Sequence, residues 1–234
     1  SPRFDLFHDQ WSTLVQHEAS KVLEQFGVSI LICTSFACCN HFYQGTDYIN
    51  ELIEKKVLRT EIDIQRYRKF LEIKSQNFQG YLMMIEELAG AFPRKNFVVR
   101  PHPSESAKPY EVLARKYPNL TVSRQFSIHA WLKCCDLLIH HFCTTAIEAK
   151  SAGVPAVAAR FAVDPDIETD LPYLGSRNAN TIADVLDAVS SHESLKFNAS
   201  LSNPRLDYSS YVANFVTGDA CKNIISAFIQ ANHS

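Results

Sequence analysis

The fold is decided by the stretch NFVVRPHP at residues 96–103, where a short run of aromatic and branched side chains is followed by an arginine and two prolines. A brief apolar run of this kind, bounded by polar residues, predicts a buried strand of a parallel sheet over residues 96–100. Pro101 and Pro103 are incompatible with a helix around His102 and predict a rigid turn. The stretch therefore places a histidine with a restricted backbone directly after a strand.

Similar apolar runs and helical patterns alternate on both sides of this stretch. Further strands are predicted at residues 28–33, 120–122, 136–139 and 155–158, and helices at residues 10–26, 60–92, 107–117, 128–134 and from 144 onward. Strands that alternate with helices predict an α/β fold, here a Rossmann-like parallel sheet in an αβα sandwich. Right-handed crossovers would place every strand-to-helix loop on one edge of that sheet, where open α/β sheets bind ligands.

The whole chain, residues 1–234, is predicted to form a single Rossmann-like domain, because no repeat, low-complexity tract or Gly/Ser-rich linker divides it. Residues 1–27 provide a leading segment and a helix, and residues 28–160 provide the core sheet. Residues 161–234 are expected to form a loop and a helical carboxyl-terminal tail, with helices at residues 181–189 and 211–230.

Composition and charge exclude several classes of protein. A content of 46% hydrophobic residues is enough for a buried core, and a formal net charge of -2 lacks the basic excess typical of nucleic-acid partners. No apolar stretch approaches the roughly 18 residues of a membrane span, and no signal peptide is recognised at the start. Seven cysteines, four of them in adjacent pairs, favour reduced thiols over disulfides or a zinc site. We therefore expect a cytoplasmic protein, either in solution or peripheral at the inner face of the membrane.

Two loops carry the candidate chemistry. The first follows the strand at residues 96–100, and its candidate binding residues are Arg100, Ser104 and Glu105 around His102. A histidine held between prolines, beside an arginine and a hydroxyl, suits an anionic ligand such as a phosphate. The alternative is a rigid turn whose histidine only satisfies a nearby carbonyl.

The second loop leads into the helix that begins with Thr144 and Thr145. Hydroxyls and unpaired backbone N–H groups at a helix start favour an anion, although a threonine there can also be an ordinary cap. Because both loops are expected on the same edge of the sheet, together they could hold the phosphate of a nucleotide.

These motifs resemble the carboxyl-terminal half of GT-B glycosyltransferases. The resemblance covers roughly residues 1–160 and is carried by residues 100–103, 131–132, 136–139, 144–149 and 152–155. More narrowly, the chain is similar to bacterial surface-carbohydrate biosynthesis proteins, and residues 1–6 resemble the segment with which such proteins cross into that half. The resemblance implies one Rossmann-like domain that binds a nucleotide sugar, with an amino-terminal domain, absent from this chain, that supplies acceptor contacts and the catalytic base.

The His-Pro pair and the paired threonines are also similar to motifs of sialyltransferases and Kdo transferases, which implies a CMP-linked sugar in preference to a UDP-linked one. Carried over by position, His102 is the candidate catalytic residue and would contact the phosphate or the leaving-group oxygen. Thr144 and Thr145 would contact the phosphate, and Glu148 the ribose or sugar hydroxyls. The bulk of residues 140–143 departs from the pattern, in which small or hydroxyl residues are expected.

The function implied is that of a nucleotide-sugar-binding domain of a glycosyltransferase in surface polysaccharide biosynthesis, with a Kdo-like CMP-sugar as donor. The expected partners are this donor, a saccharide or glycolipid acceptor and the amino-terminal domain, with no nucleic acid, cofactor or metal. Two alternatives remain open: a sugar-nucleotide epimerase of the same architecture, and a binding module without catalytic activity.

Three further features have competing interpretations. Residues 36–48 could line a cleft or form a plain connection, and the acidic pair in Asp164-Pro165-Asp166 matches a metal-binding spacing that short sequences often produce by chance. Basic residues on the predicted helix 60–92 could face a membrane or a lipid acceptor; they are Arg59, Arg66, Arg68, Lys69 and Lys74. Acidic residues are interspersed among them, so we favour a solvated helix face.

Overall fold

In the part of the chain that the structure describes, six parallel strands form one sheet in the order β3-β2-β1-β4-β5-β6. In the computed structural model, which describes residues 5–7, 9–41, 48–167, 173–192, 222–224 and 226, the strands are β1 (Ser29–Cys33), β2 (Phe97–Arg100), β3 (Leu120–Val122), β4 (Cys135–His140), β5 (Ala156–Ala159) and β6 (Arg177–Ala179). The first five strands lie where the sequence predicts them. The sixth was not predicted, because three residues at a sheet edge carry too little of an apolar pattern.

The order of the strands creates a switch point beside β1. The chain leaves β1 toward β2 and β3, and it then returns to the other side of β1 with β4. Cys33, the last residue of β1, is aligned with Arg100 on one neighbouring strand and with His140 on the other. The carboxyl ends of these three strands are therefore level, and the connections that follow them diverge there, as in open sheets that bind ligands.

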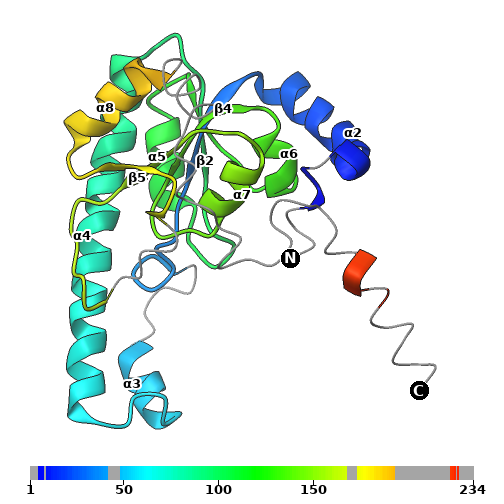
Figure 1. The fold of residues 1–234 in the computed structure, drawn as a ribbon. Helices are drawn as coiled ribbons and strands as arrows, with labels where there is room; N and C mark the ends of the chain where they lie inside the picture. Colours follow the sequence, from blue (N-terminus) through cyan, green and yellow to red (C-terminus); the bar gives the residue numbers. More distant parts are fainter. Residues whose placement is uncertain are drawn as a thin grey trace.

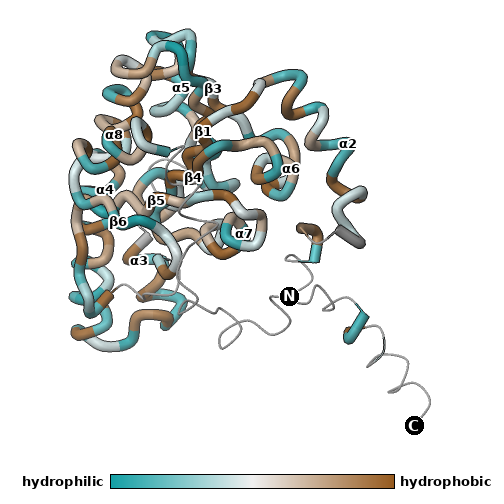
Figure 2. The backbone as a smooth tube through the Cα atoms, turned by 45° about the horizontal axis from the view of Figure 1, so that its top comes forward, coloured by the Kyte–Doolittle hydropathy of each residue, from teal (hydrophilic) through white to brown (hydrophobic). Residues whose placement is uncertain are grey.

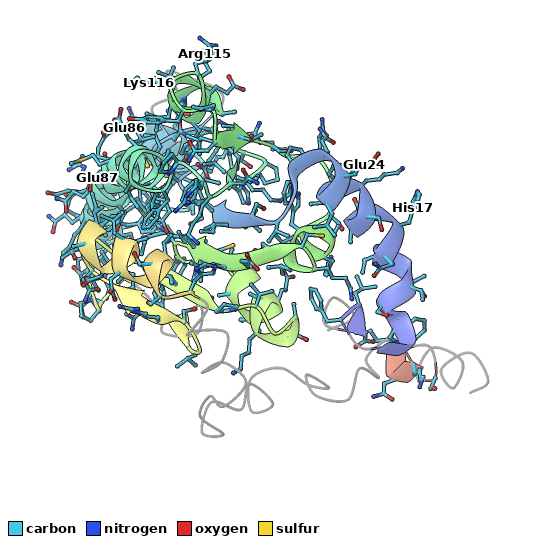
Figure 3. The ribbon with its side chains drawn as sticks, turned by 90° about the horizontal axis from the view of Figure 1, so that it is seen from above. His17, Glu24, Glu86, Glu87, Arg115 and Lys116 are labelled. Atoms are coloured by element: carbon cyan, nitrogen blue, oxygen red, sulfur yellow. The ribbon has the colours of Figure 1, made fainter. Side chains whose placement is uncertain are left out.

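Helices cover both faces of the sheet, which confirms the predicted αβα sandwich (Figures 1 and 3). One face packs against α4 (Glu61–Ala91), α5 (Lys108–Ala114) and α8 (Ile182–Ser190), and the other against α2 (Asp9–Phe26), α6 (Ile128–Leu132) and α7 (Thr145–Ser151). Consecutive strand residues alternate between the two cores: Ile30 and Ile32 join the first, and Leu31 joins the second. This is why the strands read as continuous apolar runs, which Figure 2 shows as brown segments at β1 and β4.

The helix α4 is the longest of the described elements and projects beyond the sheet (Figure 1). Its 31 residues correspond to about 46 Å, whereas the six residues of β4 span about 20 Å. Thr60 caps its first turn through a capping box with Asp63. Buried positions occur only from Lys74 onward, so the first half of the helix lies outside the main core. A short helix, α3 (Tyr48–Glu54), lies near this projecting end, in a region where the sequence predicted no helix.

Most of the predicted carboxyl-terminal tail lies outside the described residues. The helix predicted at residues 181–189 is confirmed as α8, with Thr181 as its cap. Of the helix predicted at residues 211–230, the structure describes only residues 222–224 and 226, which are helical. Within the described part of the chain, no helix combines the length and the apolar character needed to cross a membrane.

Candidate functional site

Three loops meet at the carboxyl edge of the sheet: those that follow β1, β2 and β4. Because β1 separates the other two strands, the ends of β2 and β4 are about 10 Å apart. The structure thus confirms that the His-Pro loop and the threonine loop lie on the same edge. Ser35, in the loop after β1, donates a hydrogen bond from its hydroxyl to the His141 carbonyl oxygen at 2.5 Å, which ties the first and third loops together.

His102 is exposed at this edge, and its backbone and ring are both held from the protein side. The Ser104 backbone N–H donates to Nδ1 of the imidazole at 3.2 Å, and the His102 backbone N–H donates to Glu105 Oε1 at 3.3 Å. Since Nδ1 accepts a hydrogen bond, the neutral ring carries its proton on Nε2. The loop therefore presents a preoriented N–H donor on an exposed side chain.

Glu105 lies in the interior and holds the first two loops together. Its carboxylate, on a residue with no exposed surface, accepts hydrogen bonds from the Thr34 hydroxyl at 2.9 Å and the Phe36 N–H at 2.9 Å. The Tyr110 hydroxyl donates to Glu105 Oε2 at 2.7 Å, and burial raises the pKa of this hydroxyl, which keeps it a donor. Glu105 was expected to contact substrate, but its oxygens face protein donors, so its structural role is to position the loop that carries His102.

Arg100 also faces the protein. Its guanidinium donates to the carbonyl oxygens of Gln125 at 3.0 Å and Phe126 at 2.9 Å, and burial lowers its pKa. Phe126 has a positive φ of 64°, a backbone conformation that bulky side chains rarely adopt. Arg124 donates to the carbonyl oxygens of His102 and Glu105. Arg100, which was predicted to bind a ligand, thus holds the loop after β3 in place. Arg124, which belongs to that loop, supports the His-Pro turn.

The two histidines at the end of β4 point into the interior. His140 and His141 have no exposed surface, and burial lowers the pKa of His140 to about 3. The His140 ring contacts the Ser176 hydroxyl at 2.9 Å through Nε2. Nδ1 of His141 lies 3.2 Å from the Lys74 ammonium, and burial and this cation hold the pKa of His141 well below its usual range.

The residues after these histidines turn outward again. Phe142 is half-buried, has a positive φ of 45°, and lies with its ring 4.8 Å from the Lys74 ammonium. Thr144 is exposed at the cap position of α7, and its side chain makes no capping hydrogen bond. Thr145 and Glu148 are buried, and the Thr145 hydroxyl accepts from the Cys143 thiol at 3.0 Å. Of the predicted residues in this loop, only Thr144 is exposed at the edge.

The basic residues of α4 were predicted to form a solvated face, and for Lys74 this prediction is wrong. Only 4% of the surface of Lys74 is exposed. It occupies the same helical stripe as Phe70, Asn77, Phe78 and Tyr81, so the helical spacing could have revealed its burial. Sequence reasoning also missed Thr34 and Tyr110, the partners of Glu105. The position of Thr34 directly after a predicted strand was the available signal for it.

The weaker sequence features have structural explanations. Phe36 is not a cleft residue but lies in the core, with its ring centroid 5.0 Å from those of Tyr81 and His141; residues 42–47 lie outside the described residues. Asp164 forms an ion pair with Lys69 and accepts a hydrogen bond from the Asp166 N–H at 2.9 Å. Within the described ranges, no group of three or more His, Cys, Asp or Glu side chains could hold a metal ion.

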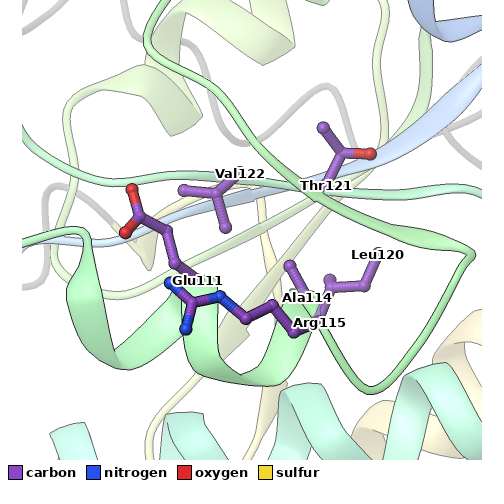
Figure 4. Close-up of a pocket in the computed structure, with 6 residues that line it drawn as sticks. All are labelled: Glu111, Ala114, Arg115, Leu120, Thr121 and Val122. Atoms are coloured by element: carbon purple, nitrogen blue, oxygen red, sulfur yellow. The ribbon is translucent and has the colours of Figure 1, made fainter.

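A separate open pocket lies at the edge of the sheet, between α5 and β3 (Figure 4). Its lining residues are Glu111, Ala114, Arg115, Leu120, Thr121 and Val122. None of them belongs to the three loops at the carboxyl edge, so this pocket is not part of the candidate site.

No protein-family model and no curated protein sequence matches the chain. Among solved structures, it is similar to a variant of the wall teichoic acid polymerase TagF, with a TM-score of 0.51 and 9% identity over 98% of this chain and 50% of that one. The UDP-GlcNAc 2-epimerase from Neisseria meningitidis bound to UDP-GlcNAc gives a TM-score of 0.48 and 14% identity over 93% and 49%. The chain therefore spans about half the length of these structures. At such identities the likeness concerns the fold, a Rossmann-like α/β domain that matches half of a GT-B structure.

Proposed function

We propose that the chain is the nucleotide-sugar-binding half of a glycosyltransferase and that the donor lies across the carboxyl edge of β2, β1 and β4. The observation that carries this proposal is the exposed His102 imidazole, which is held so that Nε2–H remains available beside the switch point of the sheet. Thr144 lies exposed on the same edge, two strands away. A phosphate between these residues would meet donors from two loops.

The chemistry requires charge stabilisation on the leaving group. As the bond between the sugar and the phosphate breaks, the sugar gains oxocarbenium character and the departing phosphate oxygen gains negative charge. A donor that is already aimed at this oxygen lowers the barrier because it need not reorient during the reaction. In this proposal His102 supplies that donor and Thr144 contacts the phosphate, while Glu105, Arg100 and Arg124 keep the His-Pro loop in place.

The finer features of the proposal follow the sequence motifs. The donor is a CMP-linked, Kdo-like sugar, and the product belongs to a surface polysaccharide. The acceptor is a saccharide or glycolipid, and a second, amino-terminal domain provides most of its contacts and the catalytic base. The reaction takes place in the cytoplasm or at the inner face of the membrane.

Calorimetry with CMP and with UDP tests the proposal. We expect CMP to bind more tightly than UDP, and His102→Ala to weaken CMP binding about tenfold through loss of a hydrogen bond to a charged group. His17→Ala is the matched control, because His17 is an exposed histidine on α2 and belongs to none of the three loops at the carboxyl edge. If neither nucleotide binds, the proposal is wrong. Release of UDP from UDP-GlcNAc without any acceptor would indicate an epimerase instead.

A further inference from the structure

The projecting half of α4 forms one wall of a groove that the mechanism above does not use. The groove has a volume of about 390 Å³; Arg66, Tyr67 and Phe70 of α4 line it, and Asp166 and Ile167 line it from the segment after β5. Ligand sites commonly measure about 300–1,000 Å³ and combine apolar walls with a few polar groups. The size and lining of this groove therefore suit a small ligand.

The groove leads toward the carboxyl edge of the sheet. Phe70 and Ile167 line both the groove and a smaller, partly open pocket, whose other walls include Lys74 and Phe142. Phe142 belongs to the loop after β4, in which Thr144 lies exposed. A ligand in the groove would consequently lie near the carboxyl edge of the sheet, the edge at which the proposed donor binds.

The lining favours a polyhydroxylated ligand. The rings of Tyr67 and Phe70 lie 5.7 Å apart at an angle of 36°, which gives one wall two neighbouring aromatic surfaces. Arg66 is exposed beside them, and Asp166 supplies a carboxylate on the opposite wall. The other acids nearby are engaged, because Asp63 caps α4 and Asp164 pairs with Lys69. Aromatic surfaces can cover the C–H faces of sugar rings, while a guanidinium and a carboxylate bind their hydroxyls.

A lipid would fit this surface less well. The aliphatic lining of the groove comes from Val57, Leu58 and Ile167, of which Val57 alone is exposed, and charged side chains lie between the apolar positions of α4. Burial of an acyl chain requires a continuous apolar area, which the charged side chains interrupt.

We propose that this groove binds a sugar unit of the acceptor saccharide, with Tyr67 as the stacking platform and Arg66 and Asp166 as the groups that bind its hydroxyls. That this saccharide is the acceptor rests on the proposed function, whereas the binding of a saccharide in the groove does not.

Saturation-transfer NMR on the full chain tests the inference, with maltose, lactose, chitobiose and sialyllactose as probes and CMP present. We expect at least one probe to receive saturation from the protein, and Tyr67→Ala to weaken its affinity about tenfold through loss of the stacked ring. Tyr67→Phe should retain the affinity because it keeps the ring, and Arg66→Gln should weaken it about fivefold. Met83→Ala is the matched control, since Met83 is 58% exposed on the other half of α4.

The outcomes separate this inference from the proposed function. If CMP binds and no saccharide does, or if saccharide binding survives Tyr67→Ala, the groove is not a saccharide site and the donor proposal stands. If saccharides bind through Tyr67 while neither CMP nor UDP binds, the groove stands and the donor proposal is wrong. A dimer in sedimentation experiments that Tyr67→Ala dissociates would assign the groove to a second copy of the chain and overturn the inference.

Discussion

Histidines lie at the carboxyl ends of both β2 and β4, at the same edge of one sheet, yet one is exposed and the other buried. His102 lies two residues beyond the end of its strand and is exposed, whereas His140 is still paired with Ala158 in the sheet and is buried. β4 is covered by helices on both faces, and five of its six residues, His140 among them, are buried. A residue two positions past the end of its strand can therefore face a ligand, while a histidine still paired within its strand packs in the core.

The largest expected effect concerns the support of the exposed loop. Glu105→Ala removes the acceptor of the Thr34 hydroxyl, the Phe36 N–H and the Tyr110 hydroxyl. We expect the free energy of unfolding to fall by about 3 kcal/mol, because buried donors without an acceptor keep their desolvation cost. Urea unfolding measures this loss. Glu111→Ala, on the exposed surface of α5, is the control, and equal losses in the two variants would show that the Glu105 network is not what holds the loop.

The dependence of stability on pH tests whether His140, at the end of β4, is buried as a neutral ring. The pKa of His140 is about 3 in the folded state because of burial, against about 6.5 when unfolded. As the pH falls below 6.5, the unfolded chain takes up a proton that the folded one cannot, so stability is lost between about pH 6.5 and pH 3. His140 should account for about 2 kcal/mol of the loss between pH 7 and pH 5.

His140→Gln tests this assignment, because glutamine can still bond Ser176 but does not titrate in this range. The variant should lose less stability than the parent between pH 7 and pH 5 in urea unfolding. Ser176→Ala keeps the buried imidazole and should keep the parent's pH dependence. A His140→Gln variant with an unchanged pH dependence would contradict the view that the buried ring stays neutral.

Tyr110→Phe tests the same support by removing one hydroxyl group beneath the His-Pro loop. Only the hydroxyl that donates to Glu105 is lost, at a residue with no exposed surface. We expect a loss of about 1 kcal/mol in thermal or urea unfolding, the usual worth of one hydrogen bond. Tyr117→Phe provides the comparison, because its hydroxyl lies 3.4 Å from Glu86 near the surface. A larger loss at Tyr117 than at Tyr110 would argue against the buried network.

The smallest expected effect is that of His102→Ala on stability. The imidazole is exposed and accepts one hydrogen bond, from the Ser104 N–H, so the free energy of unfolding should change by no more than about 0.5 kcal/mol. The same variant is expected to weaken CMP binding, which separates a ligand-facing role from a structural one. A loss comparable to that of Glu105→Ala would place His102 among the structural residues.

The strands and the common edge of the two loops could be predicted because they follow from local patterns. The apolar run at residues 97–99 and the prolines after it describe β2 and its turn without any tertiary information. The threonines at the start of α7 were correctly placed for a similar reason. Because the strands are parallel and all end at the same edge of the sheet, both loops then had to share that edge.

The direction of individual side chains could not be predicted in the same way. Glu105 and Thr34 are 71 positions apart, and only the folded chain brings the carboxylate against the hydroxyl. Arg100 is aimed at Gln125 and Phe126 because the loop after β3 passes beside it, a contact that no local pattern encodes. The sequence can therefore identify polar residues near a strand end. Which of them face outward depends on long-range hydrogen bonds that form only in the folded chain.

The two strands at the margins of the sheet, β3 and β6, have only three residues each. Unpaired backbone groups along a sheet margin can recruit a strand from another molecule, which is a common route to aggregation. Margins this short offer such a strand only a few hydrogen bonds, and at β3 the charged side chains of Glu111 and Arg115 stand beside the margin (Figure 4). The margins of the described sheet thus oppose edge-to-edge polymerisation.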